Sequence, residues 1–240
     1  MTDKEVDALL KRAAEQPHEV DAAVIRRVSE TVLPSLGPVR PLPPSWAIAL
    51  AMQLIFLAVA ILGATRLGLN GVHVLSRAES SLIFWVLGSL ALMTASAGAA
   101  EMAPASKSRI DPRILLASCV VAFMAIFAIL FDDYRTDRFV PEGIRCVAAG
   151  LLDAAPAGLL LWLVVRRGLI LNKASAGVAV GTLAGLAGFG MLELHCPILK
   201  AMHLMVWHIA VIPLSALAGY LVGRLVQALG VKRRAAEFMQ

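Results

Sequence analysis

One short segment, residues 193–208, gathers the side chains best able to bind a metal or react with an oxidant. Its sequence is ELHCPILKAMHLMVWH, and it holds three of the chain's five histidines and one of its three cysteines. Zinc, cadmium and copper prefer thiolate and imidazole ligands. Cys196 and His203 are seven residues apart and share a helical face, whereas we expect His208 to point toward a different neighbour. The segment therefore predicts a metal- or redox-responsive site.

The position of Cys196 predicts a reactive thiol. Pro197 suits the first position of a helix, so we expect Cys196 to be the N-cap of the last helix. A helix N-terminus lowers the pKa of a thiol placed there. With Cys146 brought across from a neighbouring helix, Cys146, Cys196 and His203 predict a soft-metal site, with His195 as a further candidate ligand.

Two alternatives stay open for these residues. Cys146 and Cys196 can instead form a disulfide, provided that their Cα atoms lie within about 7 Å of each other. His203 and His208 can instead anchor the helix at the membrane interface beside Trp207.

Two further polar residues fall inside apolar runs. Asp153 lies two turns from Cys146 on the same helical face. It is either a proton- or metal-responsive carboxylate or a neutral acid hydrogen-bonded to a neighbouring helix. We expect Cys119 to be a packing residue, because an isolated cysteine behaves as a small apolar side chain.

The surrounding elements are predicted to be membrane helices. Apolar residues make up 59% of the 240 residues, charged residues only 16%, and mean hydropathy is +0.77. Such a composition, arranged in long runs, is typical of a polytopic membrane protein. Six runs are long enough to span a bilayer: Trp46–Thr65, Ser81–Ala100, Ile114–Phe131, Cys146–Val165, Ser175–Leu194 and Met202–Val226. The sequence thus predicts an all-α fold, an integral membrane six-helix bundle with a short cytoplasmic N-terminal helical tail.

The distribution of basic residues predicts the orientation of this bundle. Sixteen of the 22 Lys and Arg residues fall in the two termini and the even-numbered loops, and the rest fall in the odd-numbered loops. By the positive-inside rule, both termini are cytoplasmic. Cys146 and Cys196 are then expected at the outer rim of the membrane.

Residues 1–33 are predicted to form an amphipathic cytoplasmic segment. A capping-box pattern at Thr2–Glu5 precedes one apolar set, and a second set recurs at helical spacing. The two sets are Val6, Leu9, Leu10 and Ala13, then Val20, Val24, Ile25, Val28 and Val32. Because acids and bases are nearly balanced here, a protein partner is favoured over a lipid surface. A Pro-rich linker (34–45), the bundle (46–228) and a cytoplasmic C-terminal tail (229–240) complete the predicted organisation.

The fifth predicted span carries a stripe of small residues. Gly177, Gly181 and Gly185 recur every four residues, which allows two helices to approach closely in lipid. The stripe predicts close helix packing. A more specific alternative is an interface along which the two helices slide during signalling. Pro156 in the fourth span and Pro213 in the sixth predict bends.

Several of these stretches resemble the NrsF-type membrane anti-sigma factors. The resemblance rests on RCVAAGLLDAAPAGLLLWLVVRRG (145–168), the Gly-rich residues 176–190 and the LHCP…H…VWH pattern (194–208). It implies a six-span protein of the bacterial inner membrane whose N-terminal segment holds an extracytoplasmic-function sigma factor inactive. It also implies a paired cysteine, here Cys146 and Cys196, one opening the fourth span, and a response to heavy metals and oxidative stress.

The sequence therefore favours a regulator and not an enzyme. Its expected partners are the sigma factor and the lipid bilayer, without direct nucleic-acid binding. No obligatory cofactor is expected beyond a transient soft metal ion at Cys146 and Cys196. A small transporter for metal ions or thiol compounds is the alternative, although apart from Asp153 no relay of ionisable residues through the spans is visible. A membrane thiol oxidoreductase is a third hypothesis, but the chain has no CxxC pair.

Overall fold

The computed structural model describes residues 11, 22–32, 42–103 and 110–238. The chain divides into two compact units, Met1–Leu42 and Pro43–Gln240, and the division falls within the predicted linker. Every element of the described residues is helical, which confirms the predicted all-α fold.

In the first unit, the structure describes helix α2 (Ala22–Val32) together with residues 11 and 42. Arg26 and Glu30 pair along its surface at 3.8 Å, and more than half of the Ile25 side chain is exposed. The other predicted contact residues, Val6, Leu9, Leu10, Ala13 and Val20, lie outside the described residues, as do the side chains of Val24, Val28 and Val32.

The second unit is a bundle whose described residues include six helices long and apolar enough to cross a membrane, as predicted. They belong to α3 (Ser45–Leu67), α5 (Arg77–Ala100), α6 (Pro112–Leu130), α7 (Phe139–Val165), α8 (Lys173–His195) and α10 (Ile209–Phe238). Three short elements join them: α4 (Asn70–Val74), α9 (Ala201–His203) and a π-helical turn, η2 (Leu204–His208). The turn runs directly into α10, so α9, η2 and α10 form the sixth span.

The starts of α5 and α7 differ most from those predicted by hydropathy, because polar residues near a helix start lower the hydropathy of the run. Helix α5 begins four residues earlier, where Ser76 and Glu79 form a capping box. Helix α7 begins at Phe139, so Cys146 lies two turns inside the helix and does not open it. At the other end, α10 continues to Phe238, through most of the predicted C-terminal tail.

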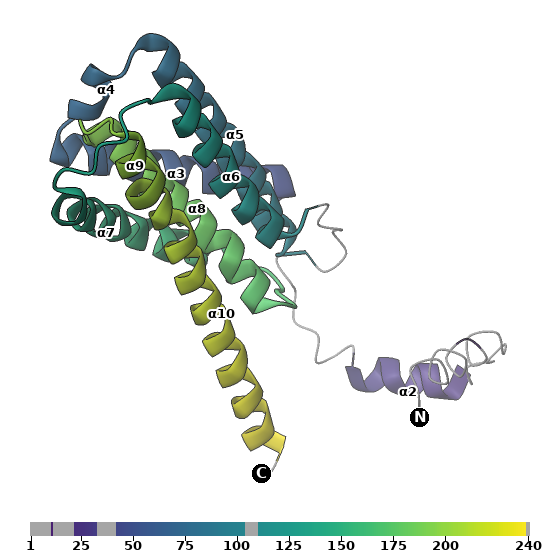
Figure 1. Ribbon diagram of the computed structural model, residues 1–240. Helices are drawn as coiled ribbons and strands as arrows, with labels where there is room; N and C mark the ends of the chain where they lie inside the picture. The colour runs from purple at the N-terminus through teal and green to yellow at the C-terminus, as the bar shows by residue number, and fades with distance from the viewer. Residues whose placement is uncertain (1–10, 12–21, 33–41, 104–109, 239–240) are drawn as a thin grey trace. The chain divides into compact units, whose positions relative to one another are not determined.

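Helix α8 is the central element of the bundle. Of the residues in its most apolar stretch, 94% are buried, against at most 44% in the other spans. It packs against α3, α5, α6, α7 and α10, and Figure 1 shows it between α3 and α10. A membrane helix buried on all faces is held by protein and not by lipid, so its position is set by five neighbours at once.

The glycines of α8 determine how closely α10 can approach. A methyl group at Gly181 would lie 2.8 Å from the Cα of Ala216, and one at Gly185 would lie 2.7 Å from the Cα of Ile212. At Gly177 it would overlap the backbone of Gly219. The three glycines of the predicted stripe therefore all face the backbone of α10.

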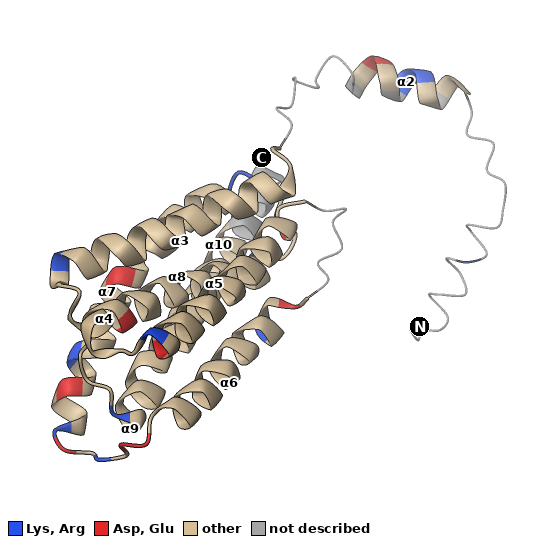
Figure 2. Ribbon diagram, turned by 90° about the horizontal axis from the view of Figure 1, so that it is seen from above, with Lys and Arg blue, Asp and Glu red and all other residues tan. Residues whose placement is uncertain are grey.

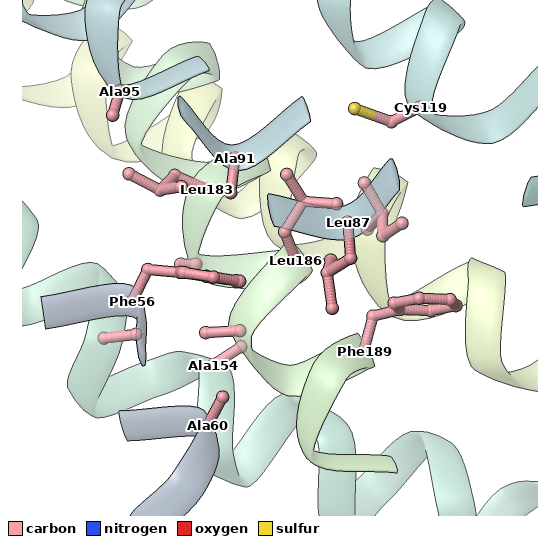
Figure 3. Packing of buried hydrophobic residues seen from close by; sticks show 14 of the residues in the cluster. Phe56, Ala60, Leu87, Ala91, Ala95, Cys119, Ala154, Leu183, Leu186 and Phe189 are labelled. Carbon is pink, nitrogen blue, oxygen red and sulfur yellow. The ribbon is translucent and has the colours of Figure 1, made fainter. Parts of the chain in front are cut away.

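The core is formed by apolar side chains that converge on α8 from its neighbours (Figure 3). The Phe189 ring lies 4.3 Å from the Phe123 ring of α6, and Phe56 of α3 and Leu87 of α5 belong to the same cluster. Cys119 of α6 is fully buried in this cluster. Charged residues lie mainly at the ends of the helices, and most of the length of α3, α5 and α6 carries none (Figure 2), as a bilayer requires.

Candidate metal and thiol site

Three connections of the bundle meet at one end, around residues 68–76, 131–138 and 196–200. The ring nitrogen Nδ1 of His195 donates to the carbonyl of Gly68 at 2.9 Å. The backbone N–H of Ala201 donates to the carbonyl of Asp133 at 2.8 Å. Asp133 also accepts hydrogen bonds from Arg135, which lower the pKa of its carboxyl group. These contacts tie together the segments that carry the thiols and imidazoles.

The two predicted thiols lie side by side. The Sγ atoms of Cys146 and Cys196 are 3.7 Å apart, and both cysteines are free. Cys146 is half-buried on α7, whereas Cys196 is only 4% exposed. A disulfide would need the sulfurs at about 2.05 Å, so bridging would require them to approach.

The expectation that Cys196 is a helix N-cap is wrong. Cys196 ends α8: its N–H donates to the Leu192 carbonyl at 2.7 Å, and its backbone then becomes extended. The cause is Pro197, which disfavours helical geometry in the residue before it. The next helix begins only at Ala201. No helix N-terminus therefore acidifies this thiol, and its pKa is raised, first by the hydrogen bond with Cys146 and then by burial.

The two imidazoles of the segment join the thiols. His203 Nε2 lies 3.8 Å from Cys196 Sγ, and the rings of His203 and His208 are 5.2 Å apart. One ligand atom from each of Cys146, Cys196, His203 and His208 lies within 4.8 Å of the others. The expectation that His208 points elsewhere is therefore wrong.

The π-helical turn explains this placement of His208. In an α-helix, residues five apart point about 140° away from each other. In η2 the Ile209 N–H bonds to the Leu204 carbonyl, five residues back, and this wider turn brings the residue at i+5 over the residue at i. His203 and His208 therefore share one face.

The turn is held against α7 by an aromatic contact. The Trp207 ring covers Gly143, where a methyl group would overlap the indole, and lies 5.2 Å from the Phe139 ring. Gly143 is one turn before Cys146 on the same helix. This packing fixes the distance between the Cys146 thiol and the imidazoles of the turn.

Glu193 is a member of the site that the sequence analysis did not select. Its Oε1 accepts a hydrogen bond from His208 Nδ1 at 2.6 Å, and both side chains are buried. The other ring nitrogen of His208, Nε2, is buried without a hydrogen-bond partner. A carboxylate inside an apolar run is costly and so marks a functional position. That signal was present in the fifth predicted span.

His195 and Asp153 lie apart from this cluster. His195 is engaged with Gly68. Asp153 packs against Gly63 of α3, and its Oδ2 is buried without a partner. The assembled group thus consists of two thiols, two imidazoles and one carboxylate, an arrangement that can coordinate a soft metal ion or undergo thiol oxidation.

The comparisons with known proteins give one finding. The model of the NrsF family, described as negative regulator of sigma F, matches residues 34–227. The match includes the whole thiol–imidazole cluster, the first five spans and nearly all of the sixth, whereas residues 1–33 lie outside it. Neither the curated proteins nor the solved structures give a match.

Proposed function

This chain belongs to the NrsF family of negative regulators of sigma F, and from that premise we propose that it is a membrane-bound anti-sigma factor with an external stress sensor. In this proposal the cytoplasmic N-terminal segment holds an extracytoplasmic-function sigma factor. A heavy metal or an oxidant acting at Cys146 and Cys196 causes its release. The observation that carries the sensing step is the 3.7 Å approach of the two free thiols beside two buried histidines.

The tail is proposed as the binding segment for physical reasons. Residues 1–33 repeat apolar side chains at helical spacing, and α2 leaves Ile25 exposed. An isolated amphipathic helix of this length is marginally stable in water, so it gains by folding against a partner. A groove on a sigma factor would supply the missing apolar surface.

The proposed orientation puts sensor and tail on opposite sides of the bacterial inner membrane. Most Lys and Arg residues belong to the termini and the even-numbered loops, which favours a cytoplasmic location for both. The thiol cluster lies at the other end of the bundle, beside the odd-numbered loops. An oxidising compartment outside the membrane is where thiols can respond to metals and oxidants.

Helix α8 is the proposed connection between the two sides. One end carries Glu193 and leads directly to Cys196. Near the other end, Ser175 donates to Glu101, the C-cap of the neighbouring α5, at 2.9 Å. In the loop that precedes α8, the backbone N–H of Leu169 donates to the Met102 carbonyl at 3.1 Å. A shift of this buried helix would therefore alter contacts on the cytoplasmic side. Such coupling requires two discrete arrangements of the bundle.

The test is the double variant Cys146→Ser and Cys196→Ser in the full-length protein. We expect repression of sigma-dependent transcription to persist, but induction by cadmium or peroxide to be lost. Cys119→Ser is the matched control, because this third cysteine lies in the core away from the cluster. Full induction in the double variant would show that the response does not require the two thiols.

A small transporter for metal ions or thiol compounds is the alternative function. Asp153, with an unpartnered carboxylate oxygen within a span, is the observation that favours it. Membrane vesicles containing the protein would then accumulate cadmium, and Asp153→Asn would abolish the uptake. If vesicles take up no cation while transcription responds to cadmium, the result supports the regulator and contradicts the transporter.

A further inference from the structure

The structure contains an unexplained buried polar atom beside the thiols. His208 is fully buried, its Nδ1 is occupied by Glu193, and its Nε2 has no hydrogen-bond partner. Burying a polar nitrogen without a partner costs free energy. His208 belongs to the only group of three or more potential metal ligands found among the described residues. A metal ion would supply the missing partner.

The geometry points to a complete four-ligand metal site formed by Cys146 Sγ, Cys196 Sγ, His203 Nε2 and His208 Nε2, with Glu193 as the positioning residue. The inference rests on the proposed function, because it specifies what the sensor binds. Glu193 accepts a hydrogen bond from the Nδ1–H of His208, which keeps the proton on Nδ1 and leaves Nε2 free as the ligand. Carboxylate–histidine–metal arrangements of this kind fix the tautomer and the ring orientation in metalloproteins.

The distances in the cluster agree with tetrahedral coordination. Zinc bonds of about 2.3 Å to sulfur and about 2.0–2.1 Å to nitrogen place two ligand sulfurs about 3.8 Å apart and a sulfur–nitrogen pair about 3.6 Å apart. The sulfurs are 3.7 Å apart, and Cys196 Sγ lies 3.8 Å from His203 Nε2. All four ligand atoms lie within 4.8 Å of one another, so the widest pair must move closer by about 1 Å to share one ion. The side chains are therefore already close to the geometry of the bound state.

The donor set determines the class of ion. Two thiolates and two imidazoles suit zinc or cadmium, which accept tetrahedral sulfur and nitrogen ligands. Magnesium and calcium require oxygen ligands, and none of the four ligand atoms is an oxygen, because Glu193 contacts His208 and is not one of the four. Two thiolates also balance the two charges of the ion, which lowers the cost of holding it in a buried position.

A bound ion would link three separate elements. Cys146 comes from α7, Cys196 follows α8, and the two histidines come from α9 and η2. Coordination would pin the start of the sixth span to α7 and to the end of the central helix. Binding of the ion would therefore change how α7, α8 and the sixth span are positioned relative to one another. Of these, α8 is the proposed connection to the cytoplasmic side.

The direct test is cobalt and cadmium titration of the full-length protein in detergent, after removal of metal under reducing conditions. We expect one Co²⁺ per chain, with the visible spectrum of a tetrahedral ion and thiolate-to-metal charge-transfer bands. Zinc and cadmium should displace the cobalt. Two results would overturn the site: a spectrum of octahedral Co²⁺ without thiolate bands, or the absence of stoichiometric Co²⁺ binding.

The positioning role of Glu193 is tested with Glu193→Gln. This variant keeps the size of the side chain but removes its charge, and we expect about 10- to 100-fold weaker zinc affinity in competition with a chromophoric chelator. The thiolate bands should remain, because both sulfurs are intact. His195→Gln is the matched control, since His195 is adjacent but bonds to Gly68, and its affinity should be unchanged. Equal affinities for Glu193→Gln and the unmodified protein would contradict the role.

These measurements separate the site from the proposed function, because metal binding in detergent involves no sigma factor. If the protein binds no metal but the cysteine double variant still loses induction, the four-ligand site is wrong and thiol oxidation carries the response. If it binds metal with the expected ligands but the variants respond normally in cells, the site stands and its regulatory role fails.

Discussion

At the scale of single residues, the two thiols differ in accessibility and in bonding. Cys146 is half-buried on α7, whereas Cys196 is 4% exposed and lies between Cys146 and His203. The hydrogen bond with Cys146 and burial raise the pKa of Cys196, so its proton is retained to higher pH than in an exposed thiol. Cys146 is therefore the thiol that a reagent in the surrounding solution reaches first.

We expect an impermeant maleimide to modify metal-free protein in intact cells at Cys146 well before Cys196, because only the thiolate form reacts and Cys146 is the more exposed of the two. Cys119 should react only after unfolding, since it is fully buried. Mass spectrometry of peptides after timed labelling measures the order. Labelling of Cys146 only from the cytoplasmic side would contradict the proposed orientation, and faster reaction at Cys196 would contradict its burial.

Sequence reasoning at this scale succeeded where spacing alone was informative. It grouped Cys146, Cys196 and His203, and the structure places all three in one cluster. It misplaced His208 because ordinary helical geometry was assumed, and nothing in LMVWH signals a π-helical turn. It overlooked Glu193 although a carboxylate inside an apolar run was visible in the sequence, because the contact with His208, fifteen residues away, exists only in the folded chain.

At the scale of elements, hydropathy locates the spans because it is a local property of each run, and all six were found. It does not reveal which span is central. Alanine and glycine fill α8, and the same residues would suit a lipid-facing helix with one packing stripe. Only the packing of five neighbours shows that every face is buried.

The close approach of α8 and α10 makes a quantitative prediction for Gly181→Ala. The added methyl group would meet backbone atoms of Ser215 and Ala216, which cannot rotate away. Overpacking of this kind costs about 1–3 kcal/mol. We expect the thermal unfolding midpoint in detergent to fall accordingly.

Gly88→Ala provides the matched control for that substitution. Gly88 also lies within a membrane helix, but a methyl group there meets no atom within 4 Å. Alanine is favoured over glycine in helices by about 0.8–1.0 kcal/mol, so Gly88→Ala should be neutral or stabilising. An equal loss of stability in both variants would show that the glycine stripe does not set the α8–α10 distance.

At the scale of the whole molecule, sensing and sigma-factor binding are assigned to different parts of the chain. The family match covers residues 34–227, which contain the bundle and the thiol–imidazole cluster. The proposed binding segment, residues 1–33, lies before it. The two compact units divide after Leu42, within the linker between them. The proposed binding segment can therefore be removed while the proposed sensor is left intact.

We expect deletion of residues 2–33 to make sigma-dependent transcription constitutive and insensitive to cadmium, because the captive factor would have lost its binding surface. The shortened protein should still bind cobalt in detergent with the affinity of the full chain, since every predicted ligand belongs to the second unit. Reporter transcription and metal titration on the same variant measure output and input separately. If repression persists while metal binding is unchanged, the sigma factor is held by the bundle instead, and the basic loop with Arg166, Arg167 and Lys173 becomes the surface to substitute next.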